Sequence, residues 1–150
     1  MPFMRNIVVV DYNPQWPLEF SEEARQIRAA LADTVVALHH IGSTSVPQLA
    51  AKPVIDILLL VRDLDELDRR NRAMADLGYQ PKGELGIAGR RFFSKGSDDQ
   101  RTHHVHAFHP DNVAAADHLA FRSYLRAHPQ RAQAYGQLKA RLARQHPDDI

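Results

Sequence analysis

Residues 39–61 read HHIGSTSVPQLAAKPVIDILLLV, and this stretch contains most of what the sequence indicates about the fold. Its last nine residues, 53–61, form a nearly continuous apolar run, which is typical of a central strand buried on both faces of a sheet. The apolar residues of 34–41 predict another strand, which ends at Gly42. The stretch therefore predicts two strands of one sheet, separated by a polar segment that begins with glycine.

The hydrophobic periodicity on either side of this stretch predicts the other elements. Helices are predicted at residues 17–31, 64–77 and 113–124, and from Pro129 onward. Further strands are predicted at residues 7–10, 91–94 and 101–108, and the glycine-dotted residues 79–90 predict a loop or hairpin turn. The order β-α-β-β-α-β-β-α-α predicts one α/β (α+β) domain over residues 1–150, in which helices flank a mixed β-sheet.

The composition restricts the classes of protein to consider. The chain has 150 residues and a formal net charge of +1, so there is no bulk electrostatic case for a nucleic-acid partner. It contains no cysteine, which excludes disulfides, thiolate metal ligands and cysteine nucleophiles. Neither a signal peptide nor an apolar run long enough to span a bilayer is recognisable. We expect a soluble, cytoplasmic protein without a membrane partner, and the sequence does not indicate its oligomeric state.

The segment Gly42-Ser43-Thr44-Ser45 is the first candidate for chemistry. Glycine lets the backbone approach a ligand closely, and hydroxyls and backbone N–H groups at such a turn can cradle a phosphate. Lys52, just before the apolar strand, is a further phosphate partner in this interpretation. On the segment alone, an ordinary capped turn is the favoured alternative, because serine and threonine are common caps.

Asp56 is a carboxylate inside an otherwise apolar strand, so it should be ion-paired, hydrogen-bonded or bound to a metal. Val54 and Leu58 share its face of the strand and cannot supply a partner. The partner must therefore come from another element. A structural pairing with Arg90, Arg91 or Lys52 is the alternative to a functional role.

His104 and His106 are the second half of this candidate site. They are separated by one residue on a predicted strand, so their side chains point to the same face. Together with Asp56 they would form a set of two histidines and one carboxylate for a divalent ion such as Mg²⁺, Mn²⁺ or Zn²⁺. The alternatives are hydrogen bonds to hydroxyls or to Asp56, or phosphate binding by the protonated pair.

Arginines provide the remaining candidates. In residues 89–93, GRRFF, strand alternation places Arg91 and Phe93 on one face and Arg90 on the other. We expect Arg91 to contact phosphate, since the guanidinium fork suits that group. The arginines of the last two helices, including Arg122 and Arg126, are expected to form a solvated face.

Several segments together resemble the GrpB-like family: residues 8–24, 40–57, 89–93, 101–108 and 118–150, among them HIGSTSVPQLAAKPVIDI and RTHHVHAF. The resemblance implies a fold similar to that of the DNA polymerase beta nucleotidyltransferase superfamily. There, a Gly-Ser turn binds nucleotide phosphate and paired carboxylates on the next strand hold metal. By position, Gly42 and Ser43 match the turn and Asp56 matches one carboxylate. Val54 and Leu58 stand where a second carboxylate is expected. Family members usually continue past residue 150 into another helix.

Three functions follow as hypotheses. The first is a metal-dependent nucleotidyltransferase acting on a small acceptor, with Asp56, His104 and His106 as catalytic and metal-binding residues. The second is a non-catalytic nucleotide-binding, phosphate-binding or chaperone-like module, related to the domain fused to some dephospho-CoA kinases. The third is a metal-dependent hydrolase that acts through a metal-bound water.

Overall fold

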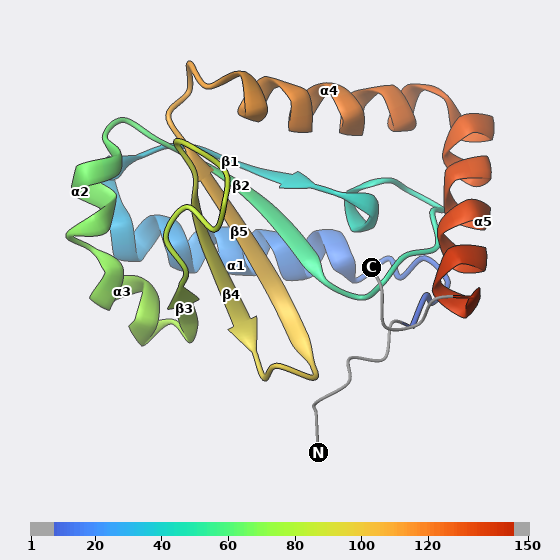
Figure 1. Ribbon diagram of the computed structural model, residues 1–150, viewed down its shortest axis with the longest axis horizontal. Helices are drawn as coiled ribbons and strands as arrows, with labels where there is room; N and C mark the ends of the chain where they lie inside the picture. Colours follow the sequence, from blue (N-terminus) through green and yellow to red (C-terminus); the bar gives the residue numbers. More distant parts are fainter. Residues whose placement is uncertain (1–7, 146–150) are drawn as a thin grey trace.

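Every residue of strand β2 (Ile55–Val61) except Asp56 is buried, as its apolar sequence predicts. The computed structural model describes residues 8–145 and places β2 second in a five-stranded sheet of order β1-β2-β5-β4-β3 (Figure 1). The other strands are β1 (Val35–Ile41), β3 (Tyr79–Pro81), β4 (Arg91–Gly96) and β5 (Arg101–Phe108). β2 and β5 run parallel and the other neighbours run antiparallel, so the predicted mixed sheet is confirmed.

The helices cover the two faces of this sheet unequally (Figure 1). They are α1 (Trp16–Leu31), α2 (Leu64–Asp68), α3 (Asn71–Asp76), α4 (Val113–Ala127) and α5 (Pro129–Gln145). α1, α2 and α3 contribute to the larger apolar core, and α4 contributes to a smaller core on the opposite face. Within residues 8–145, no helix combines the length and the apolar character that crossing a membrane requires.

The alternation of side chains along β2 determines where the polar site lies. Ile55, Ile57 and Leu59 belong to the α1 core, whereas Leu58 and Leu60 pack with α4. Asp56 therefore lies on the face of the sheet that α4 covers, at the N-terminal end of β2. The apolar contacts of α4 are with Leu58 and Leu60, so they do not extend over Asp56.

Two predictions of secondary structure were wrong in detail. The helix predicted over 64–77 is two helices, α2 and α3. At the break between them, the backbone N–H of Arg70 donates to the carbonyl of Leu67, three residues back, and forms a turn in place of a continuous α-helix. In the strand predicted at 7–10, Val10 forms only an isolated bridge with Ala51, and residue 7 lies outside the described residues. For residues 79–90, the hairpin alternative is confirmed: they begin with the short edge strand β3 and connect it to the antiparallel strand β4.

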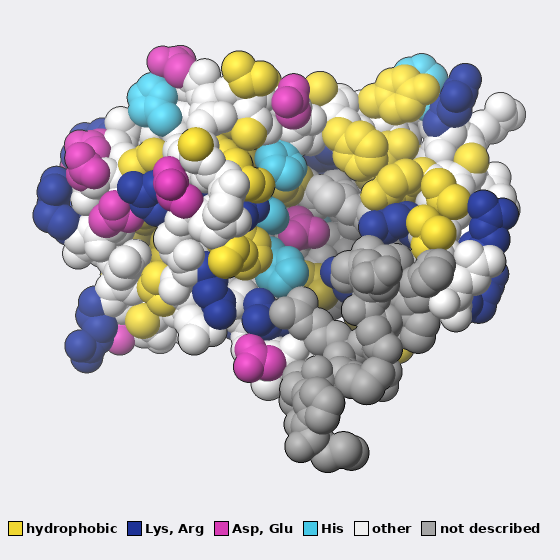
Figure 2. Space-filling model, in the orientation of Figure 1, with side chains coloured by type: hydrophobic (Ala, Val, Ile, Leu, Met, Phe, Trp, Pro, Cys, Tyr) yellow, Lys and Arg dark blue, Asp and Glu magenta, His cyan; other side chains and the backbone are white. Residues whose placement is uncertain are grey.

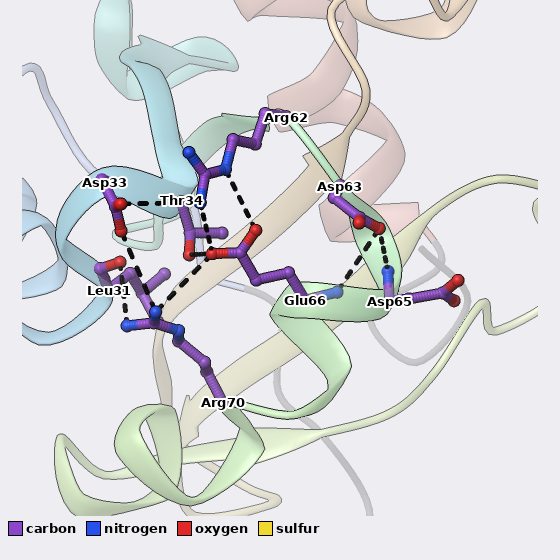
Figure 3. Close-up of polar contacts among 8 residues, drawn as sticks. All are labelled: Leu31, Asp33, Thr34, Arg62, Asp63, Asp65, Glu66 and Arg70. Atoms are coloured by element: carbon purple, nitrogen blue, oxygen red, sulfur yellow. Dashed lines mark hydrogen bonds and ion pairs between the residues drawn. The ribbon is translucent and has the colours of Figure 1, made fainter.

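A polar cluster around Glu66 joins β1, β2 and α2 at the other end of the sheet (Figure 3). Glu66 accepts hydrogen bonds from Thr34 Oγ1 at 2.8 Å and from both Nε and Nη2 of Arg62, at 3.0 and 2.9 Å. Arg70 lies 3.6 Å from the same carboxylate. The hydrogen bonds from Arg62 and Thr34 lower the pKa of Glu66 to about 2. This carboxylate holds the start of β1 against α2.

Candidate functional site

The Gly-Ser turn lies directly against Asp56. Gly42 has φ 73° and ψ −174°, a backbone conformation that residues other than glycine rarely adopt. A Cβ atom at this position would lie 2.7 Å from Oδ2 of Asp56, closer than any real contact. The register of β1 on β2, which pairs Ile41 with Asp56, creates this approach. Glycine is therefore required here for two reasons, the backbone conformation and the neighbouring carboxylate.

The hydroxyls of the turn have different roles. Ser45 Oγ donates to the carbonyl of Gly42 at 2.5 Å, and its side chain is buried. Thr44 Oγ1 is also buried; it donates to the carbonyl of Val54 at 3.4 Å and lies 2.9 Å from Nε2 of His40. These two hydroxyls hold the turn, as in the capped-turn alternative. Ser43 is half-buried and lines a cavity together with Gly42 and Thr44.

His40 contacts the turn through Thr44. Its ring stacks on Phe20 with centroids 5.0 Å apart and planes 7° apart. Because Thr44 donates to a carbonyl, its oxygen is left to accept from His40 Nε2–H, so a neutral His40 ring carries its proton on Nε2. Burial, followed by the charge of Arg126, lowers the pKa of His40 to about 4. His40 is therefore uncharged at neutral pH.

Asp56 is brought together with His104 and His106 by the parallel pairing of β2 and β5, in which Asp56 lies opposite His104. Oδ1 of Asp56 is 3.5 Å from Nδ1 of His104 and 3.3 Å from Nε2 of His106. Burial alone would raise the pKa of Asp56, but the hydrogen bonds from the two histidines outweigh it and hold the pKa far below its ordinary value. Asp56 is therefore a carboxylate anion at neutral pH.

The second ring nitrogen of each histidine has no hydrogen-bond partner among the described residues. Among the described residues, Nε2 of His104 and Nδ1 of His106 are buried and have no hydrogen-bond partner. A buried polar atom without a partner costs free energy, and such atoms are kept where they have a use. Phe92 of β4 packs against both rings, with centroids 5.2 Å away in each case.

The predicted metal ligands do not make a self-contained metal centre. Within residues 8–145, no group of three or more histidine, aspartate or glutamate side chains is arranged to hold a metal ion. Both imidazoles are directed at one oxygen of Asp56, as in the predicted alternative of a hydrogen-bonded set. The missing second carboxylate is not replaced by another acid in this arrangement.

Arg91 was the wrong choice of arginine for this site. It pairs with Ala107 across the sheet, on the α1 face, and its guanidinium binds Asp68 of α2 at 2.7 and 3.1 Å. Arg90 comes nearer to the site: its guanidinium lies 5.0 Å from the ring centroid of Phe92 and donates to the carbonyls of Glu84 and Leu85. The alternation was predicted correctly, but the face that carries the site was not.

A cavity of about 190 Å³ joins the Gly-Ser turn to α4 and α5. Gly42, Ser43, Lys52 and Asp56 line one end of it. The other end is lined by three side chains that the sequence did not single out, Phe121, Tyr135 and Lys139. Figure 2 shows histidine side chains gathered around an acidic side chain in a hollow of this surface.

Helix α4 also supplies polar groups that sequence reasoning missed. The ring of His118 lies 5.2 Å from that of His106. Arg122 is half-buried and donates to the carbonyl of His40 at 3.1 Å, so the prediction of a solvated side chain was wrong for it. Arg126 is exposed, as predicted, and its Nε also donates to the carbonyl of Ser45 at 3.0 Å. The available signal was their spacing: residues four apart share one helix face, and this face meets β1 and the turn.

A mixed sheet with helices on both faces, and a Gly-Ser turn lying against a carboxylate on the next strand, define a nucleotidyltransferase-like fold. Solved structures of the Cid1 poly(U) polymerase have this fold: one, with Mg and 3′-dATP bound, matches with a TM-score of 0.53 at 14% identity, over 78% of this chain and 38% of that one. At such low identity the likeness shows the fold alone.

The chain belongs to the GrpB protein family, because the sequence profile of that family matches residues 6–150. It is 48% identical to UPF0157 protein YqkA of Bacillus subtilis over 97% of this chain, and 44% identical to UPF0157 protein PA4798 of Pseudomonas aeruginosa over 95% of it. It spans only 42% and 60% of those two relatives. The crystal structure of conserved protein GrpB from Enterococcus faecalis matches with a TM-score of 0.91 at 45% identity, over 95% of this chain and 87% of that one.

The predicted relation to dephospho-CoA kinase has partial support. The dephospho-CoA kinase of Mycobacterium tuberculosis is 32% identical over 74 residues, which are 47% of this chain and 18% of that protein. The helix expected after residue 150 lies outside the described residues, which are 8–145.

Proposed function

We propose that the cavity binds the phosphate group of a small-molecule ligand. The observation that carries the proposal is the lining of one cavity by a glycine turn, the half-buried hydroxyl of Ser43 and two lysines, Lys52 and Lys139. Among the described lining residues, Lys52 and Lys139 are the cations and Asp56 is the acid. Lysine ammonium groups and hydroxyls are common partners of phosphate oxygens.

The contacts of Ser43 favour this role over that of a simple cap. Its two hydroxyl neighbours, Thr44 and Ser45, already hold the turn through their bonds to Val54 and Gly42. Ser43 forms part of the cavity wall and is not needed for those bonds. In this function the protein is a binding module, and no chemical step is required of it.

Calorimetric titration with inorganic tripolyphosphate tests the proposal. We expect binding to weaken about tenfold or more when Lys52→Gln or Ser43→Ala removes one charge or one hydroxyl from the wall. Lys82→Gln is the matched control, since it removes the same charge from the segment that follows β3, outside the described cavity lining. Equal loss in Lys82→Gln, or no binding by the unaltered protein, would refute a phosphate site here.

Nucleotidyl transfer to a small acceptor is a second candidate, and the charged carboxylate of Asp56 beside the same cavity favours it. Its neighbours in fold are nucleotidyltransferases, one of which was solved with Mg and 3′-dATP. A divalent cation, Mg²⁺, Mn²⁺ or Zn²⁺, is the cofactor that this function requires. Since the described residues do not form a three-ligand set, the other ligands of that cation would have to come from the phosphates.

The release of pyrophosphate from nucleoside triphosphates distinguishes the two candidates. Transfer predicts metal-dependent release that falls at least a hundredfold in Asp56→Asn, because that change removes the carboxylate charge. Binding of tripolyphosphate without any release would leave the binding function and discard transfer. The hydrolase hypothesis has less support, because His104 and His106 are engaged with Asp56.

A further inference from the structure

The phosphate proposal uses only the charge of Lys139 from the end of the cavity formed by α4 and α5, and it leaves the two aromatic side chains there without a role. Phe121 of α4 and Tyr135 of α5 meet there edge to face, with ring centroids 5.4 Å apart and planes at 73°. Nζ of Lys139 lies 5.9 Å from the centroid of the Tyr135 ring. An aromatic pair and a cation thus line the same cavity whose other end is Gly42 and Asp56.

At the aromatic end, Phe121 is exposed and Tyr135 is half-buried. Phe121 keeps 45% of its surface accessible, and Figure 2 shows hydrophobic side chains gathered over the region of α4 and α5. An exposed ring face beside a polar cavity is suited to another flat ring. Stacking of a nucleobase on an aromatic side chain is favourable and tolerates different bases, because every base has a π face.

The position of this wall is set by close packing of α5. Gly136 follows Tyr135, and a Cβ atom there would lie 2.6 Å from Cδ1 of Leu49, so the helix lies directly on the segment that leads to Lys52. Leu49 is buried in a small core with Ala132 of α5. The aromatic end is therefore held at a constant position relative to the phosphate end, which lowers the entropy cost of binding a ligand across both.

We propose that Phe121 and Tyr135 bind the base of a nucleotide whose phosphate group lies at Gly42 and Ser43. The proposal rests on the proposed phosphate function and names the class of ligand, a nucleotide in place of a simple phosphate ester. A planar ring at one end and phosphate at the other match the aromatic and cationic ends of the cavity. Lys139 adds positive charge to the aromatic wall, which suits a ligand that carries phosphates.

Calorimetric titration of the purified chain with ATP, GTP, CTP, UTP and inorganic tripolyphosphate tests this inference, because tripolyphosphate has the phosphates without the base. We expect at least one nucleotide to bind more tightly than tripolyphosphate. Tyr135→Leu and Phe121→Leu, which keep apolar packing, should weaken that nucleotide about tenfold and leave tripolyphosphate unchanged. Tyr124→Leu is the matched control, since Tyr124 is an equally exposed aromatic of α4 that stacks on His128 outside the described cavity lining.

The outcomes separate this inference from the function on which it rests. Nucleotides that bind no more tightly than tripolyphosphate, or that are unaffected by both aromatic variants, would overturn the base site and leave the phosphate site. Equal losses in Tyr135→Leu and Tyr124→Leu would also overturn it, since the effect would then be general. Absence of binding by every probe would overturn both proposals.

Discussion

Asp56 and Glu66 are both carboxylates with several partners, but they lie in different surroundings. Glu66 receives donors from Thr34, Arg62 and Arg70, so its charge is matched by groups of the fold itself (Figure 3). Asp56 has two histidines whose remaining nitrogens have no partner, and it lines a cavity. A carboxylate whose neighbours are all satisfied stabilises the fold, whereas one whose neighbours keep unused donors or acceptors is better placed to receive a ligand.

The contact between Gly42 and Asp56 should give the largest effect, because it distinguishes this end of the sheet from the Glu66 end. Gly42→Ala is expected to lower the free energy of unfolding by about 3 kcal/mol or more, since it adds backbone strain and a clash with Oδ2. Chemical denaturation measures this loss.

Gly83→Ala is the control for that experiment. Gly83 also has positive φ, at 63°, but a Cβ atom there would meet nothing within 4 Å. Gly83→Ala should lower the free energy of unfolding by about 1 kcal/mol, from backbone strain alone. If the two variants lose the same stability, the close approach of Asp56 to the turn contributes nothing and the comparison fails.

The two ends of the sheet should also lose stability in different pH ranges. The pKa of His40 is about 4 in the folded protein against 6.5 for a free histidine, so the unfolded chain binds the proton more tightly. The contribution of His40 is fully present above pH 6.5 and is lost as the pH falls toward 4. Between pH 7 and 5 this amounts to about 2 kcal/mol, and His40→Gln should reduce the loss of stability in this range by that amount. Burial also lowers the pKa of His39, His103 and His118, so a smaller slope should persist.

Glu66 should affect stability in a lower pH range than His40. Its pKa is lowered from 4.5 to about 2, so its contribution is present above pH 4.5 and lost as the pH falls toward 2. Denaturation curves at a series of pH values should therefore show a His40-dependent loss first and a loss abolished by Glu66→Gln second. A single loss below pH 4.5 in the unaltered protein would contradict the assignment of a depressed pKa to His40.

The smallest effect is expected at Arg91, on the face away from the cavity. Arg91→Gln should leave tripolyphosphate binding unchanged and should cost about 0.5 kcal/mol of stability, because its partly exposed ion pair with Asp68 contributes little. Titration and denaturation of the same sample measure both quantities. Weakened tripolyphosphate binding in this variant would show that Arg91 takes part in the site. It would contradict the conclusion that only the α4 face of the sheet contributes to binding.

Arg90 and Arg91 illustrate how far the sequence carried the prediction. Strand alternation placed them on opposite faces, and in the structure Arg91 pairs with Ala107 whereas the guanidinium of Arg90 lies over the ring of Phe92. Which face carries the site depends on the pairing of β4 with β5, and a strand shifted by one residue presents its other side chains. His118 and Arg122 were missed for a similar reason, because the orientation of α4 on the sheet comes from the packing of Ala115 against Leu58 and Leu60.

The sequence by itself determined the order of most elements, the buried central strand and the need of Asp56 for polar partners. These properties depend on the period of the apolar residues and on the cost of burying a charge, and both can be read along the chain. Only the tertiary structure decided that the partners are His104 and His106, that Gly42 lies against Oδ2, and that Tyr135 faces the same cavity. Such contacts join residues far apart in the chain, so they follow from strand register and helix packing, which local sequence does not specify.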